Sequence, residues 1–434
     1  MTKGCSGFQI DDLASDDNTL QSPEQLKQKN RILKRVLCLL CFELIAFFFA
    51  APYIILLALD PERGLFDNSF SDAQRLWCYA LLVGFYPLLQ SIVAPFVGKR
   101  LDNSRSSVSV LRSIHLANCI CYCLLAVAAY YKSFFIALVG LSIPGVIGCA
   151  SPVGKTLIAA FTLPENRTRE FAKLAFIKGL VKLLAPLAGV AVFTMWVNEQ
   201  CYFPLFAISA LFSGFCFLLS FRLILPKISK NPSQKQICRP ALTVFTTVFR
   251  QNFSLIGVFV LLLTGYVVFV KYIPFVCFQE LGQTPSLINY FSSVVGLAYC
   301  VNQFVASRFT HHIESKQHLL FFVLSASCLL LALPVSTSMW FTLVFTTLFS
   351  FSVLATCVEA KLSLQGLLGA PGTVQGVLYS FENWCYLLAP FIGSGLATMG
   401  KHYPLYFALA ASCIATLIYS GVRVKERVNM SKSA

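Results

Sequence analysis

The chain has 434 residues, of which 57% are hydrophobic and only 12% are charged, and its formal net charge is +15. Soluble globular domains are roughly a quarter charged, so a water-soluble fold is excluded and a lipid bilayer must cover much of this apolar surface. The mean hydropathy of +0.71 agrees with that conclusion.

Apolar runs of about 20 residues, long enough to cross a bilayer as helices, recur along the whole chain. The predicted spans are 36–59, 76–97, 108–130, 134–158, 172–193, 203–221, 253–275, 286–305, 319–335, 340–358, 377–398 and 404–421. The longest polar connection between them, 225–252, divides the spans six and six. The sequence therefore predicts an all-α membrane protein of twelve transmembrane helices in two six-helix bundles.

Positive charges are distributed unevenly between the two sides of the predicted membrane domain. With the N-terminus in the cytoplasm, 26 of the 34 Lys and Arg residues lie in cytoplasmic segments or at the helix ends beside them. Four lie on the opposite side: Arg63, Arg75, Lys132 and Lys401. This is the positive-inside pattern, so both termini are predicted to be cytoplasmic. The basic charge thus reports topology, and no nucleic-acid partner is expected.

The spans and polar segments divide the chain into five parts. These are a disordered cytoplasmic tail (1–32), a first bundle (33–224), a cytoplasmic linker (225–252), a second bundle (253–421) and a cytoplasmic tail (422–434). The fifth and eleventh spans share the pattern Leu-Ala-Pro-x-x-Gly, at 184–189 and 388–393. Pro and Gly are common in membrane helices, but the matching positions favour two related halves.

Short motifs connect several of these spans. The second span ends in Tyr86-Pro-Leu-Leu-Gln-Ser-Ile-Val-Ala-Pro-Phe-Val-Gly98, and Gly98-Lys-Arg-Leu-Asp102 follows it. Thr162-Leu-Pro-Glu-Asn-Arg167 precedes the fifth span, and Gly372-Thr-Val-Gln-Gly376 precedes the eleventh. Together these motifs resemble the major facilitator superfamily, and within it the tetracycline- and drug-efflux-like branch. The resemblance implies gating and hinge roles for Gly98, Asp102, Arg105, Gly179, Pro186, Gly189, Gly376 and Pro390.

The chain departs from that family pattern at three places. At the end of the fourth helix, where the family usually has Asp, this chain has Ala160. After Asp102 the family pattern continues with Arg, Gly, Arg and Arg, whereas this chain has Asn103, Ser104 and Arg105 followed by two serines. The motif of the fifth helix, usually Gly-Pro-x-x-Gly-Gly, reads Ala-Pro-Leu-Ala-Gly-Val. Because these signatures are incomplete, the direction of transport does not follow from the resemblance.

Charged residues deep in the spans are the strongest candidates for function, because a charge at the bilayer centre costs roughly 2.5–3.5 kcal/mol on insertion scales. Glu43 lies roughly 10–15 Å from the cytoplasmic end of the first span, which suits a proton carrier. A structural pairing of Glu43 with a cation of another helix is the alternative. Lys178 and Lys182 share one face of the fifth span and require an anionic partner, either Glu43 or a substrate carboxylate or phosphate.

Three further residues are candidates for coupling or substrate binding. Lys155, near the cytoplasmic end of the fourth span, either reaches the interface with its long side chain or contributes a charge to a central cavity. Glu382 and Asn383 lie early in the eleventh span, where Glu382 would close a gate or take part in coupling.

Other polar residues of the spans are assigned structural roles. Gln90 and Asn302 are predicted to form hydrogen bonds between helices. Arg112 and His115, near the start of the third span, are predicted to lie at the cytoplasmic surface, and Lys271 at the opposite interface.

The predicted function is a secondary transporter that moves a small organic solute by alternating access. Because no phosphate-binding loop is present, the energy is expected to come from an ion gradient, with protons carried by Glu43 as the coupling ion. Export of a drug or siderophore and uptake of an anionic nutrient or metabolite stay open, as does a non-transporting sensor or scaffold. The sequence offers no deep catalytic group and no metal-spaced cluster, so we expect no enzyme activity, no cofactor and no metal. A monomer in a bacterial inner membrane is expected.

Overall fold

A computed structural model of the chain describes helices and the turns that join them, and no strand occurs in the part of the chain that it describes. The described residues are 23–60, 62–67, 69–101, 107–148, 153–154, 164–196, 202–223, 246, 249–250, 253–281, 292–302, 317–331, 342–351, 353–355, 358 and 371–433.

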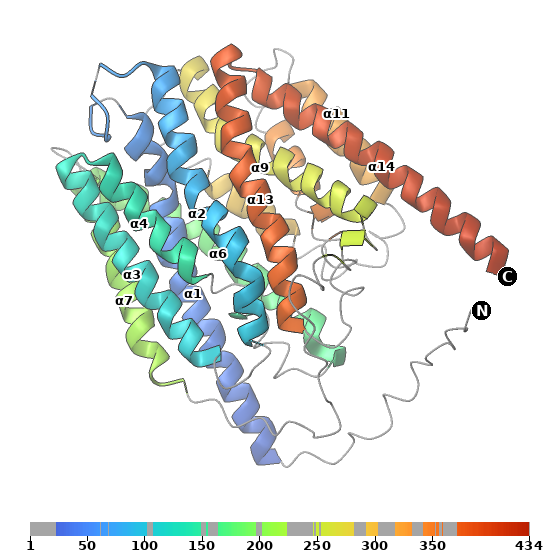
Figure 1. Cartoon of the computed structure of the whole chain (residues 1–434), viewed down its shortest axis with the longest axis horizontal. Helices are drawn as coiled ribbons and strands as arrows, with labels where there is room; N and C mark the ends of the chain where they lie inside the picture. Colours follow the sequence, from blue (N-terminus) through green and yellow to red (C-terminus); the bar gives the residue numbers. More distant parts are fainter. Residues whose placement is uncertain are drawn as a thin grey trace.

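The helices form two groups that follow one another along the chain (Figure 1). The first group is α1 (Pro23–Leu59), α2 (Asp72–Leu101), α3 (Ser107–Tyr131), α4 (Phe134–Ile147), α6 (Pro164–Trp196) and α7 (Phe203–Ser220). The second is α9 (Phe253–Leu281), α11 (Gln317–Leu331), α13 (Pro371–Met399) and α14 (Tyr403–Ser433), with shorter apolar helices at Ser292–Asn302 and Thr342–Ala355. Among these helices, seven are long and apolar enough to cross a membrane.

Two helices extend beyond the spans predicted for them, and one ends early. α1 begins at Pro23 and α14 continues to Ser433, so both reach into the predicted tails. Neither extension contains Gly or a second Pro, and long charged side chains are good helix formers. α4 ends at Ile147 rather than 158, because Gly148 adopts a φ of +118°, a conformation that ends a regular helix.

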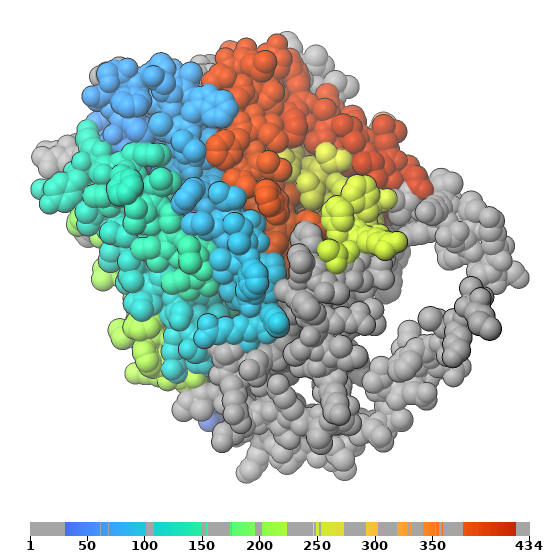
Figure 2. All heavy atoms as spheres, in the orientation of Figure 1, coloured from blue at the N-terminus to red at the C-terminus, as the bar shows by residue number. Residues whose placement is uncertain are grey.

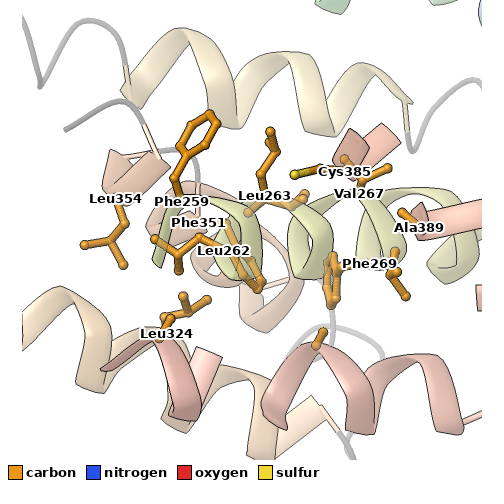
Figure 3. Close-up of a cluster of buried hydrophobic side chains, with 14 of the residues drawn as sticks. Phe259, Leu262, Leu263, Val267, Phe269, Leu324, Phe351, Leu354, Cys385 and Ala389 are labelled. Carbon is orange, nitrogen blue, oxygen red and sulfur yellow. The ribbon is translucent and has the colours of Figure 1, made fainter. Parts of the chain in front are cut away.

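Each half has an apolar core, and the core of the second half also includes Ala58, Leu76 and Tyr79 of the first. In the first half α1 is central, and its Phe48, Tyr53 and Leu57 are buried against residues of α3, α4, α6 and α7. In the second half α9 is central (Figure 3). Its Phe259, Leu262, Leu263, Val267 and Phe269 are packed with residues of α11, α13 and the helix Thr342–Ala355. The prediction of two helical bundles is confirmed.

α2 and α13 join the two halves along a seam that follows both helices (Figures 1 and 2). The Ser394 hydroxyl donates to the Leu76 carbonyl at 2.8 Å, and the Ser380 hydroxyl donates to the Ser91 carbonyl at 2.8 Å. The two helices run antiparallel, because higher numbers on α13 meet lower numbers on α2. Since the contacts span several turns of each helix, the seam holds the halves together over much of their length.

The two ends of the bundle are named here after one residue each. At the Arg35 end, the Arg35 guanidinium donates to the Arg222 carbonyl at 3.2 Å. At the Asp60 end, Lys132 donates to the Glu62 carbonyl at 3.0 Å and so fastens the turn after α3 to the loop after α1.

At the Asp60 end, the Asp60 carboxylate accepts hydrogen bonds from three donors. The Tyr202 hydroxyl donates to Asp60 at 2.5 Å, and the backbone N–H groups of Glu62 and Arg63 donate to the other carboxylate oxygen. The ring of Tyr202 is fully buried and stacks with that of Phe193. This cluster connects the end of α1 to α6 and to the start of α7.

We predict that Tyr202→Phe destabilises the protein by about 2 kcal/mol, because a hydrogen bond to a charged group is lost from a buried hydroxyl. Thermal unfolding of the purified protein in detergent measures the change. Tyr131→Phe is the matched control, since Tyr131 is 69% exposed. Equal melting temperatures for the two variants would show that the Asp60 cluster does not contribute to stability.

Candidate functional site

Lys182 is surrounded by aromatic rings from three helices. Its ammonium group donates to the Tyr266 hydroxyl at 3.3 Å. The same group lies 5.8 Å from the ring centroids of Phe48 and Tyr266 and 5.9 Å from that of Tyr299. A cation within about 6 Å of a ring centroid is attracted by the ring. Because Phe48 belongs to α1 and both tyrosines belong to the second half, Lys182 lies where the halves meet. We call these four residues the Lys182 cage.

The position of the cage follows from a close helix crossing. A Cβ atom on Gly296 would lie 2.4 Å from the backbone nitrogen of Leu183, so only glycine lets the helix Ser292–Asn302 approach α6 here. One turn earlier on α6, a Cβ on Gly179 would lie 3.0 Å from the backbone nitrogen of Cys300. Two small residues on facing helices permit such contact in membrane proteins. The backbone on either side of Lys182 is thus held against the second half.

Positive charge accumulates around the cage. Lys178 and Lys271 both interact electrostatically with Lys182. Lys271, which was predicted at the membrane interface, has a partly buried side chain and interacts electrostatically with Lys182. Among the residues that the structure describes, no acidic side chain forms an ion pair with Lys182. The arrangement is suited to a negatively charged ligand.

Glu382 is connected to the Lys182 cage by electrostatic interactions of tyrosine hydroxyls. The hydroxyl of Tyr386 on α13 interacts electrostatically with Glu382, Tyr266 and Tyr299. Lys182 and Glu382, two of the predicted functional residues, are thus connected through Tyr266 and Tyr386. Asn383 follows Glu382 in the sequence and is buried. Its side-chain amide donates to the Tyr379 carbonyl of its own helix at 2.8 Å.

Glu43 faces α3 and does not pair with Lys182. One carboxylate oxygen accepts a hydrogen bond from Asn118 at 3.1 Å, and the other lies 3.6 Å from Nδ1 of His115. The predicted surface position of His115 is wrong, since its side chain is 0% exposed. His115 and Asn118 belong to a stripe with the buried Leu111 and Ile114, spaced three or four residues apart. That spacing is the signal that would have placed His115 inside the bundle.

The remaining polar predictions have different outcomes. Arg112 lies near the Arg35 end, where it donates to the Ser220 carbonyl at 3.4 Å. Gln90 accepts from the Tyr379 hydroxyl of α13 at 3.0 Å, which confirms the predicted bond between helices. The amide of Asn302 is buried and has no hydrogen-bond partner among the described residues, so its predicted bond is not found there. Lys155 lies outside the described residues.

The glycines predicted to act in gating lie at close helix contacts. A Cβ on Gly376 would lie 2.5 Å from the Ala94 carbonyl oxygen and 3.2 Å from the Cα of Gly98, at the Arg35 end of the seam. A Cβ on Gly189 of α6 would lie 2.7 Å from the hydroxyl of Tyr53 on α1.

The two predicted gating prolines lie inside helices, and the predicted loop charges cannot be placed. Pro186 is buried within α6. The carbonyl of Pro390 accepts from the buried Tyr272 hydroxyl of α9 at 2.5 Å, which joins α9 to α13. Asp102 and Arg105 lie outside the described residues.

Two solved transporter structures have a fold similar to that of this chain. The crystal structure of the human organic anion transporter MFSD10 (TETRAN) is similar with a TM-score of 0.67 and 17% identity, over 92% of this chain and 100% of that one. The outward-facing crystal structure of a bacterial homologue of the iron transporter ferroportin, with soaked iron, gives a TM-score of 0.61 at 15% identity, over 91% and 98%. At these identities the likeness concerns the fold alone. No curated protein sequence matches the chain.

The family is shown by sequence. A family model described as Major Facilitator Superfamily matches residues 36–371, which is most of the chain. The match includes the seam helix α2, the Lys182 cage and the Glu43 neighbourhood. The chain is therefore a multi-pass membrane transporter that belongs to the major facilitator superfamily.

Proposed function

We propose that the chain transports a small organic anion by alternating access, with protons as the coupling ion. The observation that carries this proposal is the Lys182 cage, in which an ammonium group lies among aromatic rings of both halves without an acidic partner among the described residues.

The chemistry of the cage favours one class of substrate. A lysine held away from water loses solvation, and a bound carboxylate, sulfonate or phosphate restores an opposite charge. The rings supply flat apolar surface, so the preferred anion carries an aromatic or similarly planar body. Lys178 and Lys271 add to the attraction. A cationic drug would be repelled by the Lys182 ammonium group. The name of the similar human structure, an organic anion transporter, agrees with this substrate class.

The helix contacts support movement of one half against the other. The halves meet along α2 and α13 and at the crossing of α6 with the helix Ser292–Asn302. Close helix contacts through small residues allow two rigid bundles to rock around a site between them. We propose 33–224 and 253–421 as the two rocking units, 225–252 as the linker between them, and a monomer as the working form. The Arg35 end is proposed as the cytoplasmic side, in keeping with its excess of basic residues.

The direction of transport has two candidates. The motifs similar to tetracycline exporters favour export, whereas the incomplete helix-five motif and Lys182 favour uptake of an anionic metabolite. We propose a bacterial inner membrane as the location of the protein.

The proposed function is tested with purified protein in liposomes under an imposed pH gradient of either sign. We choose naphthalene-2-sulfonate as the probe, because it is permanently anionic and does not cross a bilayer as a neutral acid. Naphthalene-2-sulfonamide is the neutral control and 2-naphthyltrimethylammonium the cationic one. We expect accumulation of the sulfonate alone. The sign of the pH gradient that drives this accumulation gives the direction of transport. Transport of the cation, or of no probe, would contradict the proposal.

A further inference from the structure

We infer that Glu43, His115 and Asn118 form the binding site of the coupling proton, inside the first half and separate from the Lys182 cage. The inference rests on the proposed function, because a coupling proton requires coupled transport. It adds two residues of α3 and a location to the predicted role of Glu43.

The three side chains are arranged so that one further proton can bind between Glu43 and His115. Asn118 binds one oxygen of Glu43 at 3.1 Å and so holds the carboxyl in place. The other oxygen and both ring nitrogens of His115 have no hydrogen-bond partner among the described residues. The Oε2–Nδ1 distance of 3.6 Å would shorten to about 2.8 Å with a proton shared between the two groups. A proton between Oε2 of Glu43 and Nδ1 of His115 would therefore give both buried atoms a hydrogen-bond partner.

Charge balance favours a single proton on the pair. With one proton the pair is either a carboxylic acid beside a neutral imidazole or a carboxylate beside an imidazolium, and its net charge is zero in both forms. Loss of that proton leaves a net charge of −1, and gain of a second leaves +1. Either change buries a net charge, which is costly in an apolar interior. The site therefore holds its proton until a conformational change gives it access to water.

The groups around the pair do not neutralise it. The Cys216 thiol of α7 interacts electrostatically with Glu43, and its sulfur lies 3.8 Å from the Leu39 carbonyl oxygen on α1. Cys41 on α1 is a further neutral thiol near this face. Arg112, one turn before His115, is engaged with the Ser220 carbonyl and lies over the ring of Phe221. Among the described residues, the carboxyl therefore has His115 as its sole ion-pair partner.

The proton site and the cage lie on different faces of α1. Glu43 and Phe48 are five residues apart, which rotates them by about 140° around the helix axis. Glu43 contacts α3, whereas Phe48 contributes its ring to the Lys182 cage. Proton and substrate therefore do not compete for one set of atoms. α1 touches both sites, so a change in its packing against α3 is the route by which protonation affects the cage.

The test has a readout that does not depend on transport. Infrared difference spectra of the full-length protein in liposomes, between acidic and alkaline buffer, report the carbonyl stretch of a protonated carboxyl. The form in which Glu43 holds the proton should give a titrating band in the wild type, and this band should be absent in Glu43→Gln and shifted in frequency in Asn118→Leu. In His115→Gln the midpoint should move by about one pH unit or more, because coupled groups titrate as a pair. An unchanged band in Glu43→Gln would overturn the inference.

Transport of naphthalene-2-sulfonate supplies the second readout. Accumulation driven by a pH gradient should fall about tenfold or more in Glu43→Gln and in His115→Gln, with exchange and binding kept within about twofold. Ser209→Ala is the control, since Ser209 is buried in the same half and bonds within its own helix at 3.2 Å. If both variants accumulate the probe like the wild type, the inference is wrong. If the wild type neither binds nor exchanges the probe, the proposed function fails, and the infrared band still decides the proton site.

Discussion

Lys182→Met should weaken the binding of naphthalene-2-sulfonate by about a hundredfold and abolish its transport. Removing one partner of a desolvated charge pair costs roughly 3 kcal/mol, which corresponds to that factor. Methionine keeps most of the length and apolar surface of lysine, so the rings of the cage keep their packing. Equilibrium binding to the purified protein measures the effect.

Stability separates a binding role of Lys182 from a structural one. No acidic partner among the described residues is left behind by the substitution, so Lys182→Met should melt at or above the wild-type temperature. Lys182→Arg should keep part of the affinity, because the guanidinium preserves the charge but not the shape. Lys401→Met, at an exposed lysine, is the control for charge alone. Unchanged affinity in Lys182→Met would remove the cage from the substrate site.

Gly296→Ala should lower the free energy of unfolding by about 1–3 kcal/mol and slow exchange of naphthalene-2-sulfonate, because its methyl would overlap the backbone of α6. The added Cβ lies 2.4 Å from the Leu183 nitrogen and 2.5 Å from the Lys182 carbonyl carbon. Backbone atoms cannot rotate away as a side chain can, so the two helices must separate beside the cage.

Gly257→Ala in α9 is the matched control, since a Cβ there meets no atom within 4 Å. Alanine favours a helix over glycine by about 1 kcal/mol at both positions, so the difference between the variants isolates the close contact. Thermal unfolding and exchange rates provide the comparison. Equal behaviour of the two variants would show that the crossing of α6 with the helix Ser292–Asn302 is not tight in the working protein.

The sequence predicted the helices well, because hydropathy responds to removal from water whichever surface covers the residue. It predicted their ends less well, since local backbone geometry decides them. α4 ends at Gly148, where a φ of +118° interrupts an apolar run that continues in the sequence. α1 begins thirteen residues before its apolar run at 36, because nothing in its polar start breaks a helix.

The candidate site was predicted only in part. Lys182 was recognised by the cost of a deep charge, and that argument needs no knowledge of its neighbours. Its rings were not predicted, because Phe48, Tyr266 and Tyr299 are far apart in sequence and only the fold brings them together. Glu43 was recognised for the same reason as Lys182, but spacing along one helix does not show which neighbour it faces. The burial of His115 was not predicted, because a position near the start of a span is compatible with the membrane surface and only the spacing from Leu111 and Ile114 places it on the buried face.

Lys182 must bind the transported anion if the cage is the substrate site. Counterflow measures this: liposomes that contain the purified protein are loaded with unlabelled naphthalene-2-sulfonate, and entry of labelled probe is followed without a pH gradient. We predict a transient accumulation for the wild type and for Lys401→Met, and none for Lys182→Met. The same transient accumulation in Lys182→Met, or its absence in the wild type, would contradict a substrate-binding role for Lys182.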